Sequence, residues 1–123
     1  MLEITADKIA YVVLRAREYQ SGINAWAHQG SRRQHGARTE LHEFLDGLND
    51  DEKAGLVAVM WIGRETFGPE ELSEAITTAR TERGDRAEDY LMAEPQLADF
   101  LESGMEALGL SPEDETDAVQ HPV

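Results

Sequence analysis

The sequence contains no cysteine, and this absence excludes several kinds of structure and chemistry. Without cysteine the chain forms no disulfide and offers neither a thiolate metal site nor a cysteine nucleophile. It also lacks an apolar run of about 18 residues, the length that a membrane-spanning helix needs. The first residues, MLEITADK, do not have the basic and then apolar order of a secretory signal. We therefore expect a cytoplasmic protein that does not insert into a membrane.

Basic residues are also scarce, because 11 Lys and Arg stand against 25 Asp and Glu, which gives a net charge of −14. Residues 1–39 hold six basic and three acidic residues, whereas residues 40–123 hold five basic and 22 acidic residues. Such an acidic body repels the phosphates of duplex nucleic acid, so a nucleic-acid partner is disfavoured. A basic protein surface or a cation fits better, although solubility alone explains the same charge.

Apolar residues at helical spacing predict a first helix over about residues 6–20, with Thr5 as its N-cap. The segment from Ile9 to Leu14 is apolar on all sides and partly β-branched, so a strand is the alternative there. Arg15, Arg17 and the residues that follow restore helical polarity. All-round apolarity predicts two packing neighbours for this helix, either within the fold or across a homodimer.

Residues 21–38 are predicted to form a long loop. Gly22, Gly30 and Gly36 punctuate this stretch, and no acidic residue interrupts it. Loops of this length are uncommon in compact domains and are often functional.

The central helix is predicted to follow Asn49, with Glu52 three residues later as in a capping box. It extends to about Thr66, and its segment Leu56–Ile62 is apolar around the full circumference. Helices of that kind are buried on several sides. A buried strand would also explain seven apolar residues, but the cap and the helix formers before the run favour a helix. We expect three large side chains here and in the last helix to be core residues: Met60, Trp61 and Met105.

The remaining apolar stripes predict helices over about residues 40–48, 69–83, 86–93 and 95–108. Since strand patterns are scarce, we predict an all-α fold, a compact single-domain bundle of five or six helices over residues 1–110. Residues 111–123 carry four acidic residues and two prolines with little to bury, and we expect a disordered acidic tail there.

Two stretches of the sequence together form recognisable motifs. They are LVAVMWIGRE from Leu56 to Glu65 and LMAEPQLADFLESGMEALGLS from Leu91 to Ser111. With the acidic helix between them, they resemble a bacterial family of unknown function, the domain-of-unknown-function family 3775, over roughly residues 39–111. The resemblance implies a helical bacterial protein and implies no activity, substrate or site.

The candidate metal ligands are three histidines with a spacing of seven residues: His28, His35 and His42. Histidine is the commonest metal ligand, and Glu40 and Glu43 stand beside His42. However, Gly30 and Gly36 argue against one continuous helix through all three, so the spacing fixes no geometry. No HExxH or comparable motif is present, and no cofactor is predicted.

A basic cluster in the predicted loop provides the candidate binding residues: Trp26, Arg32, Arg33 and Arg38. Arginines beside an aromatic ring can hold a phosphate or a single nucleic-acid strand through charge and stacking. In a chain with this net charge, the simpler interpretation is that the arginines pair with carboxylates of the protein itself.

Arg64 is a further candidate binding residue, because it follows the buried run directly and its planar fork suits a ligand carboxylate. A charge at the rim of a core is normally paired, and the favoured interpretation is an ion pair with Asp99 or Glu102. Neighbouring Gly63 would let another backbone approach closely.

No nucleophile elbow, phosphate loop or dinucleotide fingerprint is present in the sequence. The leading hypothesis is therefore a non-enzymatic protein-interaction or regulatory domain that binds a protein partner or itself, with the helix over 6–20 as the simplest dimer contact. The alternative is a small-molecule or metal-dependent enzyme with a site near the 21–38 loop.

Overall fold

A computed structural model of the chain describes residues 2–25, 30–83 and 86–110, and the side chains of residues 19–25, 30–35, 37 and 83 lie outside this description. Within these ranges the chain forms helices and no strand, which confirms the all-α prediction. The helices are α1 (Ala6–Ala25), α2 (Gly30–Asp46), α3 (Asp50–Gly63), the short 3-10 helix η1 (Pro69–Glu71), α4 (Leu72–Arg83), α5 (Ala87–Met92) and α6 (Leu97–Leu108). No helix of this part of the chain is both long and apolar enough to cross a membrane.

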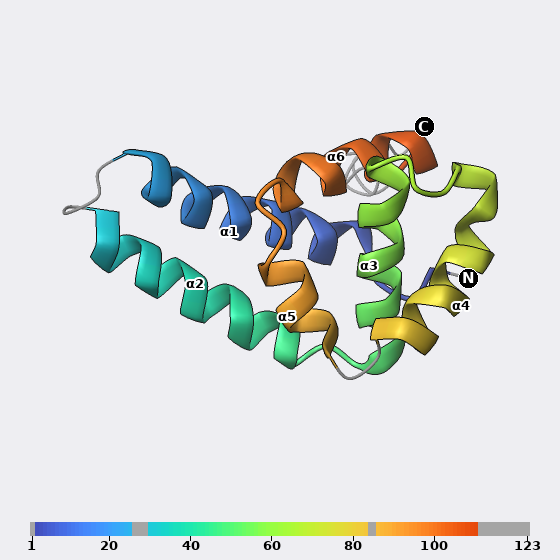
Figure 1. Ribbon diagram of the computed structural model, residues 1–123, viewed down its shortest axis with the longest axis horizontal. Coiled ribbons are helices and arrows are strands. Elements are labelled where there is room, and N and C mark those ends of the chain that lie inside the picture. Colours follow the sequence, from blue (N-terminus) through green and yellow to red (C-terminus); the bar gives the residue numbers. More distant parts are fainter. Residues whose placement is uncertain (1, 26–29, 84–85, 111–123) are drawn as a thin grey trace, which may run out of the picture.

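The helices are arranged as a hairpin that leads into a bundle (Figure 1). Helices α1 and α2 lie side by side and antiparallel, and the far end of this hairpin extends beyond the other helices. Helix α3 occupies the middle of the bundle, where α4, α5 and α6 all pack against it. Helix α6 also packs on α1, so it joins the hairpin to the bundle.

Helix α3 is the buried central helix that the sequence predicts. The Asn49 side chain accepts a hydrogen bond from the Glu52 backbone N–H at 2.7 Å, and the Glu52 carboxylate accepts one from the Asn49 N–H at 3.0 Å. These bonds satisfy two of the N–H groups that a helix start leaves without partners. The whole run from Leu56 to Ile62 is buried, and the core prediction for Met60, Trp61 and Met105 is confirmed.

Two glycines allow α3 and α6 to cross at very short range. A Cβ atom added at Gly63 would overlap the backbone of Phe100, and one added at Gly104 would overlap the Val59 carbonyl. The close approach predicted at Gly63 is therefore present, and the neighbouring backbone belongs to α6.

The predicted loop over 21–38 is wrong wherever the structure describes it. Helix α1 continues to Ala25 and α2 already begins at Gly30, so only residues 26–29 lie outside the description. Glycine disfavours a helix interior by about 1 kcal/mol, a small cost that packing can outweigh. Leu41 and Leu45 of α2 are fully buried, and the rings of Phe44 and Tyr11 lie 4.5 Å apart between α2 and α1. The predicted acidic tail, residues 111–123, lies outside the described residues.

The apolar faces of α1 have both of their neighbours inside the chain. Ile9, Val12, Val13 and Ala16 are buried, and α1 packs on α2 and on α6. Among the described side chains of this helix, Leu14 is the large apolar one that stays exposed, at 56%. The apolarity that suggested a dimer contact through this helix is thus explained by packing within the fold.

Candidate functional site

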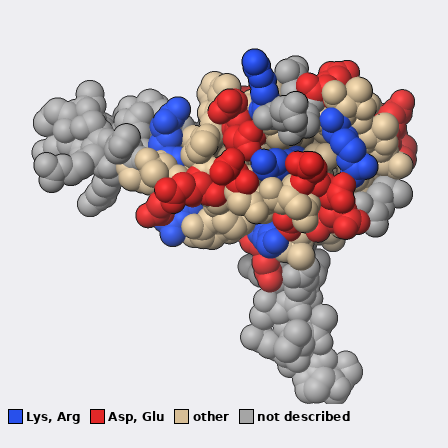
Figure 2. Space-filling model, turned by 90° about the horizontal axis from the view of Figure 1, so that it is seen from below, with Lys and Arg blue, Asp and Glu red and all other residues tan. Residues whose placement is uncertain are grey.

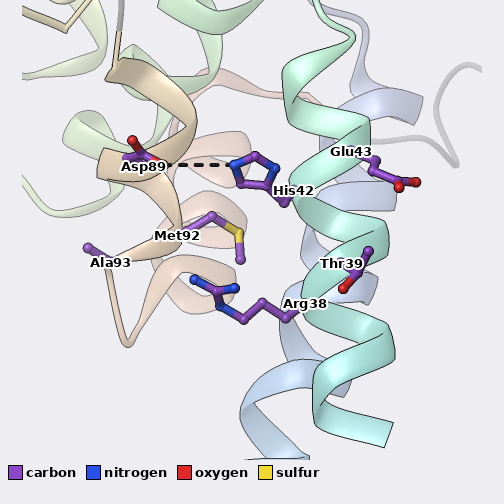
Figure 3. Close-up of a pocket in the computed structure, with 7 residues that line it drawn as sticks. All are labelled: Arg38, Thr39, His42, Glu43, Asp89, Met92 and Ala93. Atoms are coloured by element: carbon purple, nitrogen blue, oxygen red, sulfur yellow. Dashed lines mark ion pairs between the residues drawn. The ribbon is translucent and has the colours of Figure 1, made fainter. Parts of the chain in front are cut away.

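An open groove lies between α2 and α5, with a volume of about 720 Å³ (Figure 3). One wall is α2 and the other is α5 with the residue that ends it. We call it the α2–α5 groove and define it by its lining residues: Arg38, Thr39, His42, Glu43, Asp89, Met92 and Ala93.

The walls are placed by the buried faces of the same two helices. Leu41 and Leu45 anchor α2 in the core, and His42 and Glu43 between them lie on the side of the helix that lines the groove. Leu91 anchors α5 in the same way and is fully buried. Asp89 of α5 consequently lies on the open side of its helix, opposite α2 (Figure 3).

The charges of the groove have both signs. His42 Nε2 lies 3.8 Å from Asp89 Oδ1, and this contact spans the groove. Its two side chains are 44% and 75% exposed, so water and salt weaken the interaction. Arg38 points into the groove and, among the described residues, forms no ion pair (Figure 3). The internal carboxylate partner expected for this arginine is therefore not found in the described part of the chain.

A largely buried ion pair beside the groove holds α5 to α3. Lys53 Nζ donates to Glu88 Oε2 at 2.8 Å, and the two side chains are only 14% and 12% exposed. The hydrogen bond from Lys53 lowers the pKa of Glu88 below its ordinary value, although burial acts in the opposite direction. The same bond raises the pKa of Lys53. Both groups are therefore held in their charged forms and are engaged with each other.

Arg64 belongs to a second polar cluster, which also links α3 to α5. Its guanidinium donates to the Tyr90 hydroxyl at 3.3 Å and lies 3.5 Å from Glu94 Oε1. The Trp61 indole N–H donates to the same hydroxyl at 2.8 Å. This arrangement gives Arg64 a structural role at the C-terminal end of α3.

The prediction that Arg64 pairs with Asp99 or Glu102 is wrong. Both carboxylates lie on α6 and interact instead with Arg17 of α1. The reason is the position of Arg64 directly after the last residue of α3, where its side chain turns toward α5 and Glu94. Arg64 thus forms the predicted ion pair at the rim of the core, but its partner is Glu94.

The predicted metal ligands are only partly described. His28 lies outside the described residues, as does the side chain of His35, whereas His42 lies in the groove. His35 and His42 do share helix α2, and a spacing of seven residues puts both positions on one face. In the described part of the chain, no three His, Asp or Glu side chains are close enough to hold a metal ion.

The other predicted binding residues have the same mixed outcome. Trp26 lies outside the described residues, and so do the side chains of Arg32 and Arg33, although their backbone belongs to α2. Arg38 lines the groove. Asp89 and Met92, which form the opposite wall, were not predicted as site residues, because no local pattern shows that α5 packs near α2.

A family model described as "Protein of unknown function (DUF3775)" matches residues 38–110 of the chain. The match begins at Arg38 and extends through α6, so it includes every residue of the α2–α5 groove. Neither a curated protein nor a solved structure matches the chain. Because the family model covers more than half of the sequence, the chain belongs to the DUF3775 family of proteins of unknown function.

Proposed function

We propose that this chain is a non-enzymatic protein-interaction domain that docks its partner in the α2–α5 groove. The observation that carries the proposal is the openness of the groove. Five of its seven lining residues are exposed, and only His42 and Met92 are half-buried. Small-molecule sites usually bury most of the ligand surface, which this groove does not do. An exposed arginine beside a half-buried methionine is typical of protein interfaces, in which both residue types are enriched.

The surface charge supports a protein partner as well. Asp and Glu side chains are spread over the face shown in Figure 2, with fewer Lys and Arg between them. A field of this sign attracts a basic protein surface and accelerates encounter with it. It also opposes binding to the phosphates of duplex nucleic acid.

A photo-crosslinking experiment tests this proposal. A benzoyl-phenylalanine replaces Glu43 on the rim of the groove, and a control chain carries it in place of Glu74 on α4. Both positions are exposed glutamates, so the change of charge is the same. We expect a discrete protein adduct from position 43 and not from position 74. Absence of an adduct at position 43, or equal adducts at both positions, would refute docking in the groove.

The alternative function, a small-molecule or metal-dependent enzyme, depends on His42 among the described residues. His42 lies in the groove beside Asp89, and both are residue types that bind metals. Elemental analysis of the purified chain tests this alternative, with His42→Ala as the matched variant. A bound metal that is lost with His42→Ala would favour the enzyme over the interaction domain.

A further inference from the structure

We infer that the α2–α5 groove receives a helix of the partner protein that carries a fixed order of side chains. A cation of that helix meets Asp89, a carboxylate one helical turn away meets Arg38, and an apolar side chain beside them packs on Met92. This inference rests on the proposed function, because it states the chemistry of the partner in the same groove. It is carried by the order of charges along the groove, by the lack of a described ion pair for Arg38 and by the spacing of the two ends.

The groove is acidic at one end and basic at the other (Figure 3). Asp89 and His42 face each other at the acidic end, and Arg38 lies at the basic end. The Met92 side chain lies between the two ends. Glu43 also lines the groove, but its side chain points away from α5. A ligand that lies along the groove therefore meets a carboxylate, then a thioether and then a guanidinium.

Arg38 forms no ion pair with any described residue. On α2 itself, the positions three and four residues away on either side hold no acidic residue, so the helix cannot supply a partner. The residues of the opposite wall at this end are Met92 and Ala93, which carry no charge. By contrast, six other basic side chains of the described chain form ion pairs: Lys8, Arg15, Arg17, Lys53, Arg64 and Arg80. Arg38 is thus available to a carboxylate from outside the described structure.

Asp89 is the acidic counterpart at the other end of the groove. Its side chain is 75% exposed, and its distance of 3.8 Å from His42 is longer than a hydrogen bond. His42 carries a charge only when it is protonated. Arg86, the N-cap residue of α5, forms no ion pair with Asp89. Asp89 can therefore accept a cation of the partner, which the negative field of the molecule also attracts.

The two ends of the groove are spaced like side chains on one face of a helix. Arg38 and His42 are four residues apart in α2, so the two ends lie about 6 Å apart along that helix. A partner helix places its residues i and i+4 at the same spacing and on one face. Its residue i+3 lies beside them, where an apolar side chain can pack on Met92. An amphipathic helix that lies in a groove between other helices is a common mode of protein recognition.

Arg38 also determines which basic partners the groove accepts. The net negative charge attracts any basic surface at long range. A helix with cations at both positions would place one of them beside Arg38, and such a like-charge contact lowers the affinity. A helix with carboxylates at both positions would meet the same obstacle at Asp89. The mixed pair is the arrangement that meets an opposite charge at each end.

Selection from a library of displayed helical peptides tests the inference, with the full chain as the target. The library is an alanine-rich helix of about 18 residues in which the positions of one face vary among Lys, Glu, Leu and Ala. At about 150 mM salt the Debye length is about 8 Å, which reduces the general attraction of basic peptides. We expect the enriched peptides to carry Lys and Glu four residues apart with Leu beside them. No enrichment, or enrichment of peptides that carry Lys without Glu, would overturn the inference.

Charge reversals show whether the enriched peptides bind in the groove. Arg38→Glu should weaken binding at least about fivefold in fluorescence anisotropy, because an attraction becomes a repulsion. A peptide in which Lys replaces the Glu should bind this variant to within about threefold of the original affinity. Asp89→Lys should be rescued in the same way by Glu in place of the peptide Lys. Arg80→Glu makes the same change of charge on α4 and should alter the affinity less than about twofold. Equal effects of Arg38→Glu and Arg80→Glu, or a failed rescue, would contradict docking in this register.

Two other occupants of the groove are outcomes of the same experiments. A free peptide with the sequence of residues 111–123 should not displace the enriched peptide, and displacement would assign the groove to this acidic segment of the chain. Self-association in sedimentation velocity that Arg38→Glu weakens would assign the groove to a second copy. Either result would overturn the inference.

Failure of this inference is distinguishable from failure of the proposed function. If the crosslink at position 43 captures a protein while the selected peptides show no preference for the mixed pair, the groove docks a partner of different chemistry. In that case the proposed function stands and the inferred charge order is wrong. If neither experiment yields a complex, both are wrong.

Discussion

Replacement of Gly104 by Ala should destabilise the protein, although alanine is the better helix former. Gly104 lies inside α6 at the crossing with α3, and it is buried. The added methyl group would overlap the Val59 carbonyl and approach the Val59 side chain. Because the principal clash is with backbone, a change of rotamer cannot relieve it, and the two helices would have to move apart.

The size of the effect follows from two opposing contributions. Removal of a glycine from a helix interior favours folding by up to about 1 kcal/mol. Insertion of a methyl group into a well-packed contact costs about 1–3 kcal/mol, and more where backbone must move. We therefore expect a net loss of about 1–3 kcal/mol in the free energy of unfolding. For a domain of this size each kcal/mol lowers the midpoint of thermal unfolding by about 4 °C.

Urea unfolding followed by circular dichroism measures this difference, and Gly36→Ala supplies the matched control. Gly36 is also helical, but a Cβ atom there would meet open space. The same substitution should therefore raise the stability by up to about 1 kcal/mol at Gly36 and lower it at Gly104. If both variants were more stable than the unmodified chain, the close crossing of α3 and α6 would be refuted.

Three further substitutions test the polar contacts of α3 and α5. Asn49→Ala removes one half of the capping box and should lower the free energy of unfolding by about 1 kcal/mol, whereas an unchanged urea midpoint would contradict the cap. Tyr90→Phe removes the acceptor of the Trp61 N–H, and we expect a loss of about 1–2 kcal/mol together with a change in tryptophan fluorescence; no change in either would count against that bond. Folding lowers the pKa of Glu88, so its ion pair with Lys53 stabilises the protein above the ordinary pKa of a glutamate, and this contribution disappears as the pH falls through the lower folded pKa. Urea midpoints between about pH 6 and pH 3 should therefore fall less steeply in Glu88→Gln than in the unmodified chain, and parallel curves would show that the pair contributes nothing.

The parts of the fold that the sequence predicts well are those with short-range causes. Asn49 and Glu52 are three residues apart, and the capping box that they form depends on nothing more distant. The buried run after it has a composition that only a buried helix or strand can tolerate, and the cap decides between the two. The loop prediction is wrong over residues 30–38 because Gly30 and Gly36 do not prevent helix formation there. The free-energy cost of a glycine within a helix is small compared with the gain from burying Leu41 and Leu45. That burial depends on packing against other helices, α1 among them, which the local sequence does not show.

The candidate site depended on contacts that no local pattern reveals. Arg38 and His42 were singled out from their residue types, but the opposite wall of the groove comes from α5, about 50 residues later in the sequence. The prediction of the partner of Arg64 is wrong for the same reason. Glu94 and Asp99 are only five positions apart in the sequence, but Glu94 pairs with Arg64 after α3 and Asp99 pairs with Arg17 of α1. Sequence patterns thus indicate that a charge needs a partner, whereas the packing of the helices selects it.

The family match and the packing together indicate that the matched segment depends on α1. The match begins at Arg38 and omits this helix, yet α1 places Ile9 and Val12 in the core with no exposed surface and adds the buried Val13, and Ile4 just before the helix is buried as well. Burial of a side chain of this size contributes about 1.5–3 kcal/mol, so these four contribute roughly 6–12 kcal/mol. The net stability of a domain is about 5–15 kcal/mol, which is the same magnitude. Without a helix in the place of α1, α2 would lose the packing that positions Arg38 and His42, and the groove would lose one of its walls.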